Sequence, residues 1–145
     1  SNYAAVACPD LPTCQAQWLP PMNFSQGFNI TQSIGPNYLG GTMDNEARIA
    51  IHFSHRVGAI ITAIFLIFAA LKLQGSKINQ AAFMGRIVLV VLALQVALGL
   101  GNIVFSFPVM IAVAHNLVGA FLLLTMITLN HRLFTAVDIG SISKE

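Results

Sequence analysis

The sequence predicts an all-α protein, built as a polytopic bundle of membrane helices. Hydrophobic residues make up 56% of the 145 residues and charged residues only 8%, whereas soluble domains usually carry about 25% charged residues. Three apolar stretches, at approximately 47–73, 82–105 and 109–133, are each longer than the roughly 20 helical residues that cross a hydrocarbon core. The net charge of +2 gives no support for a nucleic-acid surface.

The segment before the first apolar stretch is expected to form an extracytoplasmic loop. It is rich in Pro, Gly, Asn and aromatic residues such as Trp18, which favour the membrane interface. Cys8 and Cys14, the two cysteines of the chain, flank the run CPDLPTC on the predicted outer side, where disulfides are permitted. We expect a disulfide, either as a structural staple or as a redox-active pair. Two thiolates without nearby His or Cys make zinc a weaker interpretation.

The first apolar stretch is expected to begin near Asp44, because Asp44 and Glu46 would lie where the helix dipole favours negative charge. This stretch, IAIHFSHRVGAIITAIFLIFAALKL, carries His52, His55 and Arg56 inside apolar sequence. Polar residues at membrane depth are costly, so they usually face a bundle interior and indicate function.

The second and third stretches also contain polar residues. Gln95 lies in the second, before the element Gly99-Leu100-Gly101, and the third contains His115 and Asn116. We expect Gln95 and Asn116 to form hydrogen bonds between helices. The glycines are interpreted as close-packing sites, since the surrounding sequence does not resemble a strand–loop–helix phosphate site.

Loop charges predict the orientation of the chain. Lys72, Lys77 and Arg86 surround the connection after the first stretch, and Arg132 ends the third stretch on the same side. This side should be cytoplasmic by the positive-inside rule. The predicted division is an extracytoplasmic loop at residues 1–46, transmembrane helices at residues 47–133 and a cytoplasmic tail at residues 134–145.

His55 and His115 form a candidate clamp for a haem iron. Each lies roughly eight residues inside the outer end of its stretch, which places both imidazoles roughly 10–12 Å below one membrane surface. Two axial imidazoles must approach a haem from opposite sides of its plane. Small residues such as Gly58 and Gly119 would leave room for a porphyrin. The alternative is that each is a packed, hydrogen-bonded histidine.

Three further residues have more than one interpretation. His52, three residues before His55 and on its side of the helix, is an alternative ligand, a propionate contact, a hydrogen-bond partner, a proton-handling group or an interfacial histidine without a role. Arg56 would pair with a haem propionate or act structurally. His131 is expected to be a boundary residue and not an iron ligand.

Three segments, in order, resemble the carboxy-terminal half of the haem A synthase family. They are SNYAAVACPDLPTCQAQWLPPMNF, GPNYLGGTMDNEARIAIHFSHRVGA and AVAHNLVGAFLLLTMITLNHRL, and the resemblance covers nearly the whole chain. It implies a pseudo-twofold protein of two four-helix halves, of which this chain would hold three helices. We therefore expect the chain to be a piece of a longer protein.

The resemblance also implies an activity. The full-length family oxidises the C8 methyl group of haem O to the formyl group of haem A, which serves terminal oxidase. His55 matches the ligand of the HR motif and His115 the ligand of the last helix, which implies a haem b cofactor. His52 replaces the catalytic Glu of the amino-terminal half, so an electron-transfer half is implied and the catalytic residues stay unknown. Cys8 and Cys14 match an outer-loop disulfide.

The implied partners are membrane lipid, haem O, the amino-terminal half, haem O synthase and an electron donor. The implied location is the bacterial inner membrane, or the mitochondrial inner membrane in a eukaryote. Two alternatives remain. One is a membrane di-histidine b-type cytochrome that carries electrons to or from quinone, and the other is a non-haem thiol–disulfide membrane protein.

Overall fold

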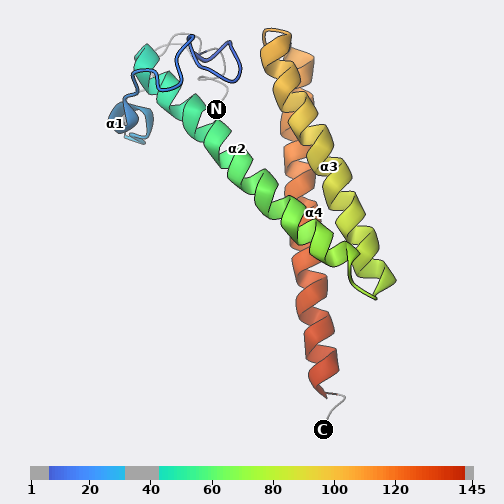
Figure 1. Ribbon diagram of the computed structural model, residues 1–145. Coiled ribbons are helices and arrows are strands. Elements are labelled where there is room, and N and C mark those ends of the chain that lie inside the picture. The colour runs from blue at the N-terminus through green and yellow to red at the C-terminus, as the bar shows by residue number, and fades with distance from the viewer. Residues whose placement is uncertain (1–6, 32–42, 143–145) are drawn as a thin grey trace. The chain divides into compact units, whose positions relative to one another are not determined.

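The computed structural model describes residues 7–31 and 43–142, and every helix or strand element assigned within them is a helix. The helices are α1 (Phe24–Gly27), α2 (Asn45–Gln74), α3 (Asn79–Val104) and α4 (Val109–Ile142), shown in Figure 1. Within the described residues, three segments are long and apolar enough to cross a membrane: α2, α3 and the Val109–Arg132 part of α4. The prediction of an all-α protein with three membrane helices is confirmed. Parts of the predicted outer loop, residues 1–6 and 32–42, lie outside the described residues.

The start of α2 agrees with the sequence prediction. The amides of Ala47 and Arg48 both donate to the main-chain oxygen of Asp44, at 3.2 Å each, so Asp44 caps the helix. The membrane-spanning part of α4, Val109–Arg132, agrees with the predicted stretch at 109–133, and the helix itself continues to Ile142. No proline interrupts the main-chain hydrogen bonds of this longer helix.

The chain forms two compact units. Unit 1 comprises Ser1–Thr62 and Leu100–Pro108, and unit 2 comprises Ala63–Gly99 and Val109–Glu145. The boundaries fall inside helices, so α2 and α3 each contribute residues to both units. The candidate residues of the first stretch, His52, His55 and Arg56, belong to unit 1, whereas His115 belongs to unit 2.

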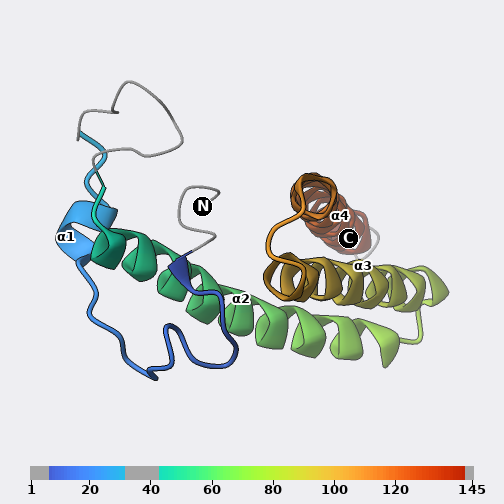
Figure 2. The same cartoon turned by 90° about the horizontal axis from the view of Figure 1, so that it is seen from above.

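Unit 1 is built where the loop before α1 lies along the first turns of α2 (Figure 2). Its buried cluster comprises Ala7, Cys8, Cys14 and Ile49, with Met22 packed against it. The short helix α1 is attached to α2 by a main-chain hydrogen bond. The amide of Asn23, the N-cap residue of α1, donates to the main-chain oxygen of Glu46 at 3.1 Å. Gly27 lies so close that a Cβ there would be 2.8 Å from the Ala47 oxygen.

Unit 2 is a packing of helices against helices. Its buried cluster takes one or two side chains from each of α2, α3 and α4: Leu66, Ala70, Val88, Leu92 and Leu129. Gly85 of α3 sets the closest approach to α2, since a Cβ there would lie 2.7 Å from the main-chain oxygen of Ala70. Small residues at such contacts let membrane helices approach each other closely.

A tight turn joins α3 to α4. Ser106 and Phe107 have φ values of 56° and 60°, in the left-handed region. The amide of Phe107 donates to the oxygen of Asn102 at 2.7 Å, which closes the end of α3. Pro108 follows directly and α4 begins at Val109, so the two helices are antiparallel and connected by only a few residues.

Candidate functional site

The outer loop of unit 1 is a small closed structure. A disulfide joins Cys8 to Cys14, with six residues of sequence separation. Cys14 and Gln17 exchange two main-chain hydrogen bonds of 2.9 and 3.1 Å. Between them, Gln15 and Ala16 have φ values of 53° and 59°. Positive φ at both central residues is the geometry of a type I′ two-residue hairpin.

Asp10 stabilises this turn from inside the loop. Its carboxylate accepts hydrogen bonds from the Thr13 hydroxyl, from the Gln15 amide at 2.7 Å and from the Ala16 amide at 2.9 Å. These bonds, the one from Thr13 first, lower the pKa of Asp10 from 3.8 to about 2. They also favour the left-handed backbone of two residues that are not glycine, a conformation that L-residues otherwise adopt at a cost.

Arg56 of α2 binds the same loop. Its Nη1 donates to the oxygen of Thr13 at 2.8 Å, and its Nη2 donates to the oxygens of Cys8 and Asp10 at 2.9 and 2.8 Å. The sequence left a propionate partner and a structural role open for Arg56. The contacts that the structure shows are with three main-chain carbonyls, so the guanidinium anchors the disulfide loop on α2.

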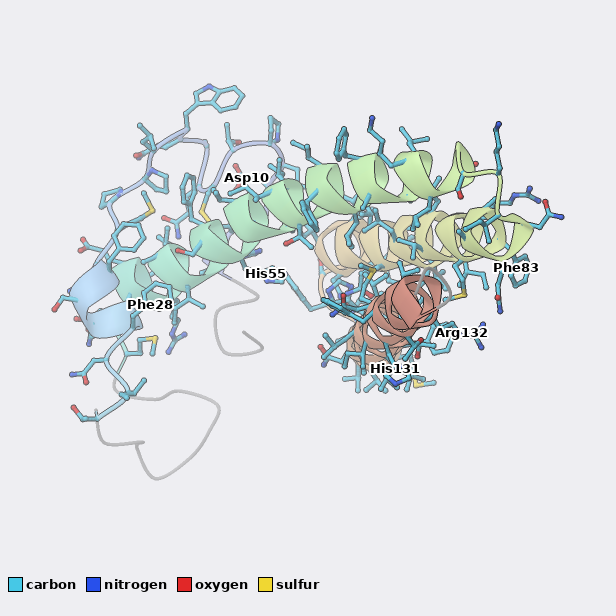
Figure 3. The ribbon with its side chains drawn as sticks, turned by 90° about the horizontal axis from the view of Figure 1, so that it is seen from below. Asp10, Phe28, His55, Phe83, His131 and Arg132 are labelled. Carbon is cyan, nitrogen blue, oxygen red and sulfur yellow. A yellow bond between two sulfur atoms is a disulfide. The ribbon has the colours of Figure 1, made fainter. Side chains whose placement is uncertain are left out.

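His52 and His55 have different environments on α2. Ile49, His52 and Arg56 recur at spacings of three and four residues, which places them along one face of the helix. Ile49 packs in the loop cluster and Arg56 binds the loop, and His52 between them is only 7% exposed. His55 is exposed, and it lies on a different side of α2 from the loop that carries Asp10 (Figure 3).

In unit 2, one residue of α3 holds both ring nitrogens of His115. The Nδ1 atom lies 3.2 Å from the main-chain oxygen of Gln95, and the Nε2 atom lies 3.3 Å from the side-chain nitrogen of Gln95. A carbonyl oxygen only accepts, so Nδ1 carries the proton and Nε2 accepts from the amide. This tautomer is assigned from the hydrogen-bond network. The prediction that Gln95 bonds between helices is confirmed.

Two glycines make this contact possible. A Cβ on Gly99 of α3 would lie 3.1 Å from Cε1 of His115. A Cβ on Gly119 of α4 would lie 3.1 Å from the side-chain nitrogen of Gln95. The interpretation of Gly99 as a close-packing site is therefore confirmed. A Cβ on Gly58, near His55 in unit 1, would meet no atom within 4 Å.

The structure thus brings together some of the predicted site residues. Arg56 joins the loop closed by Cys8 and Cys14, and His115 joins Gln95. His55 and His115 belong to different units, so their pairing stays a prediction. Among the described residues, no cluster of three or more His, Cys, Asp or Glu side chains is placed to hold a metal ion.

The sequence did not single out Asp10 or the contact between Gln95 and His115. Asp10 stands between two prolines in CPDLPTC, a setting typical of turns, and this composition was the available indication. For Gln95 the indication was its position four residues before Gly99 on the same helix. A polar side chain beside a glycine that admits a neighbouring helix is a candidate for contact with that helix.

Comparison with known proteins gives one family. The family COX15-CtaA, described as "Cytochrome oxidase assembly protein", matches residues 1–127. A protein of Shewanella oneidensis named "Heme A synthase" is 41% identical over 134 residues, which are 92% of this chain and 40% of that protein. A protein of Paracoccus denitrificans with the same name is 30% identical over 118 residues, which are 80% of this chain and 27% of that protein.

The chain therefore spans less than half the length of these two relatives. No solved structure matches it. The family match covers most of the chain, including the cysteine loop and the helices that carry His55 and His115. This chain belongs to the COX15-CtaA family of cytochrome oxidase assembly proteins.

Proposed function

We propose that this chain is the carboxy-terminal half of a haem A synthase and that it binds haem b between His55 and His115. The observation that carries the proposal is the 41% identity to a protein named "Heme A synthase" over 92% of the chain. The full-length protein would act as an oxidoreductase that converts the C8 methyl group of haem O to a formyl group.

The two histidines fit a haem iron by their chemistry. At His115, the bond between Nδ1 and the Gln95 carbonyl fixes the tautomer whose ligand atom is Nε2. Such second-shell bonds are usual for metal-binding histidines, because they set ring orientation and raise ligand basicity. At His55, the side chain is exposed, and the nearby Gly58 faces open space where a flat ligand needs room.

Other residues on α2 and α3 would position these two ligands. Arg56 and the loop that it binds fix the outer part of α2, next to His55 in the sequence. His52 is buried on the loop-facing side of that helix, which supports a packing role for His52 and favours His55 as the proposed ligand. Gln95 orients His115 from α3.

His55 and His115 would hold haem b through their imidazoles, and the haem would supply one-electron transfer in this half. The proposal therefore assigns electron transfer to this half and oxidation of haem O to the amino-terminal half. The partners would be that half, haem O, an electron donor, haem O synthase and membrane lipid. The location would be the inner membrane of a bacterium or of mitochondria.

The test uses the full-length protein, purified in detergent, with reduced-minus-oxidised spectra and extraction of its haems. We expect His55→Ala and His115→Ala each to deplete haem b by at least about tenfold, because each would lose a side chain proposed to hold the haem. Both should suppress haem A formation. His131→Ala, an exposed histidine at the end of the α4 span, serves as the control and should keep both. Full haem b in His55→Ala or His115→Ala would contradict the proposal.

A further inference from the structure

The contact between Gln95 and His115 has two parts that differ in kind. The main-chain oxygen of Gln95 lies at Nδ1, and the side-chain nitrogen of Gln95 lies at Nε2. An iron ligated by His115 needs the Nε2 lone pair, because Nδ1 is protonated and donates a hydrogen bond to the carbonyl. The side-chain amide of Gln95 therefore occupies Nε2, the atom that would bind the iron, whereas the main-chain carbonyl does not compete with the iron for that atom.

We propose that the Gln95 side chain is a positioning residue that holds His115 Nε2 until haem b binds and is then displaced from it. The main-chain carbonyl of Gln95 keeps its bond to Nδ1 throughout. This inference rests on the proposed function, since it assumes that His115 is a ligand of haem b. It adds a residue of α3 to a site whose predicted ligands lie on α2 and α4.

Gln95 is suited to this exchange. Its side-chain oxygen accepts no hydrogen bond from the described residues, so the amide group is held only through its nitrogen. The net contribution of a neutral hydrogen bond to stability is small, so this bond is weak compared with a metal–ligand bond. In the membrane, an imidazole without any partner would be costly. The amide thus satisfies His115 at low cost to later ligation.

The carbonyl contact depends on Gly99 and not on the Gln95 side chain. His115 is fixed through both nitrogens, so its ring has little freedom to retreat from a Cβ placed 3.1 Å from Cε1. Substitution of Gly99 should therefore disturb the ring orientation that ligation uses. The two parts of the contact predict opposite effects on haem binding, which makes them separable.

The first experiment titrates haemin into full-length protein produced in haem-deficient cells, followed by absorbance. In Gln95→Met the side chain keeps its length but loses the donor, and we expect the dissociation constant to fall about 3- to 10-fold, the equivalent of one lost hydrogen bond. Gln95→Asn should act in the same direction, because its shorter amide does not reach Nε2. Gln80→Met, an exposed position on α3, is the matched control and should leave the constant unchanged.

The second experiment compares two glycine substitutions on α3. Gly99→Ala should raise the dissociation constant for haemin about 10- to 100-fold, the usual effect of disturbing a second-shell contact. It should also shift the midpoint potential of the bound haem. Gly85→Ala crowds the Ala70 oxygen elsewhere in unit 2, so it controls for crowding between helices and should change neither quantity.

The outcomes separate this inference from the proposed function. If His115→Ala binds haemin as tightly as the unsubstituted protein, His115 is not a ligand and both proposals are wrong. If His115→Ala loses haemin but Gln95→Met and Gln95→Asn bind it equally or more weakly, only the displacement of Gln95 is wrong. Tighter binding in both Gln95 variants, together with weaker binding in Gly99→Ala, supports the inference.

Discussion

The two units hold their polar groups in place by different means. In unit 1, a disulfide and the carboxylate of Asp10 hold a loop outside the helices together, and three bonds from Arg56 attach this loop to α2. In unit 2, His115 is fixed by one residue of a neighbouring helix, at a contact that two glycines permit. Unit 1 relies on many polar bonds around a charged group, and unit 2 on close helix packing.

The difference between the units follows from the surroundings of these polar groups. The loop of unit 1 lies before α2, on the predicted watery side, where main-chain groups need partners but charge is tolerated. The helices of unit 2 satisfy most of their main-chain bonds internally, and the contact of His115 with the main chain and side chain of Gln95 is between neutral groups. We therefore expect charge-removing changes to affect unit 1 most and volume-adding changes to affect unit 2 most.

The largest effect is expected for Arg56→Met. Each hydrogen bond to a charged group contributes roughly 1.5–3 kcal/mol to stability. Water would replace part of the three bonds that Arg56 donates, so we expect the free energy of unfolding to fall by about 3 kcal/mol in total. Thermal unfolding of the full-length protein measures it. Arg86→Met, an exposed arginine of α3, is the control. Equal unfolding temperatures for the Arg56 variant and the unsubstituted protein would show that the loop is held without this anchor.

A smaller effect is expected for Gly85→Ala in unit 2. The added Cβ would lie 2.7 Å from the Ala70 oxygen, and because that oxygen is main chain, a helix must shift. Overpacking of this kind costs about 1–3 kcal/mol. Gly58→Ala is the comparison, since its Cβ meets nothing within 4 Å and the change should stabilise α2 by up to about 1 kcal/mol. The same sign for both substitutions would remove the role assigned to close packing.

The smallest effect concerns the pH dependence of the loop. The folded pKa of Asp10 is lowered from 3.8 to about 2. The stabilisation by its carboxylate is therefore complete above 3.8 and is lost as the pH falls through about 2. The rate at which a phosphine reduces the Cys8–Cys14 disulfide should therefore rise as the pH falls from 3.8 to about 2. Asp10→Asn should react faster at neutral pH and show no such rise, whereas an unchanged profile would contradict the role of Asp10.

Much of the fold followed from the sequence because hydrophobicity and helix length are local properties. The three membrane helices could be predicted in this way, and the start of α2 near Asp44 followed from the acidic residues Asp44 and Glu46. The continuation of α4 beyond its membrane-spanning part to Ile142 was not predicted, since the residues there are no longer consistently apolar. Hydrophobicity indicates where a membrane helix leaves the lipid, and not where its main-chain hydrogen bonds stop.

The contacts of the site were less accessible to sequence reasoning. Arg56 was singled out for its charge, but its acceptors are main-chain oxygens, which no residue pattern marks. Gln95 and His115 were both recognised as polar residues inside apolar helices. Their pairing depends on how α3 and α4 are aligned along their lengths, which the short turn and the glycines Gly99 and Gly119 determine in three dimensions.

The anchor of the outer loop has a consequence for its tolerance of mutation. The three oxygens that Arg56 contacts belong to the main chain of Cys8, Asp10 and Thr13, and every amino acid supplies such an oxygen. Pro9 and Leu11, between them, have exposed side chains. Substitution of these two residues leaves the acceptors in place as long as the backbone of the disulfide loop keeps its conformation. One arginine is thus compatible with many loop sequences, and the loop can vary without loss of its attachment.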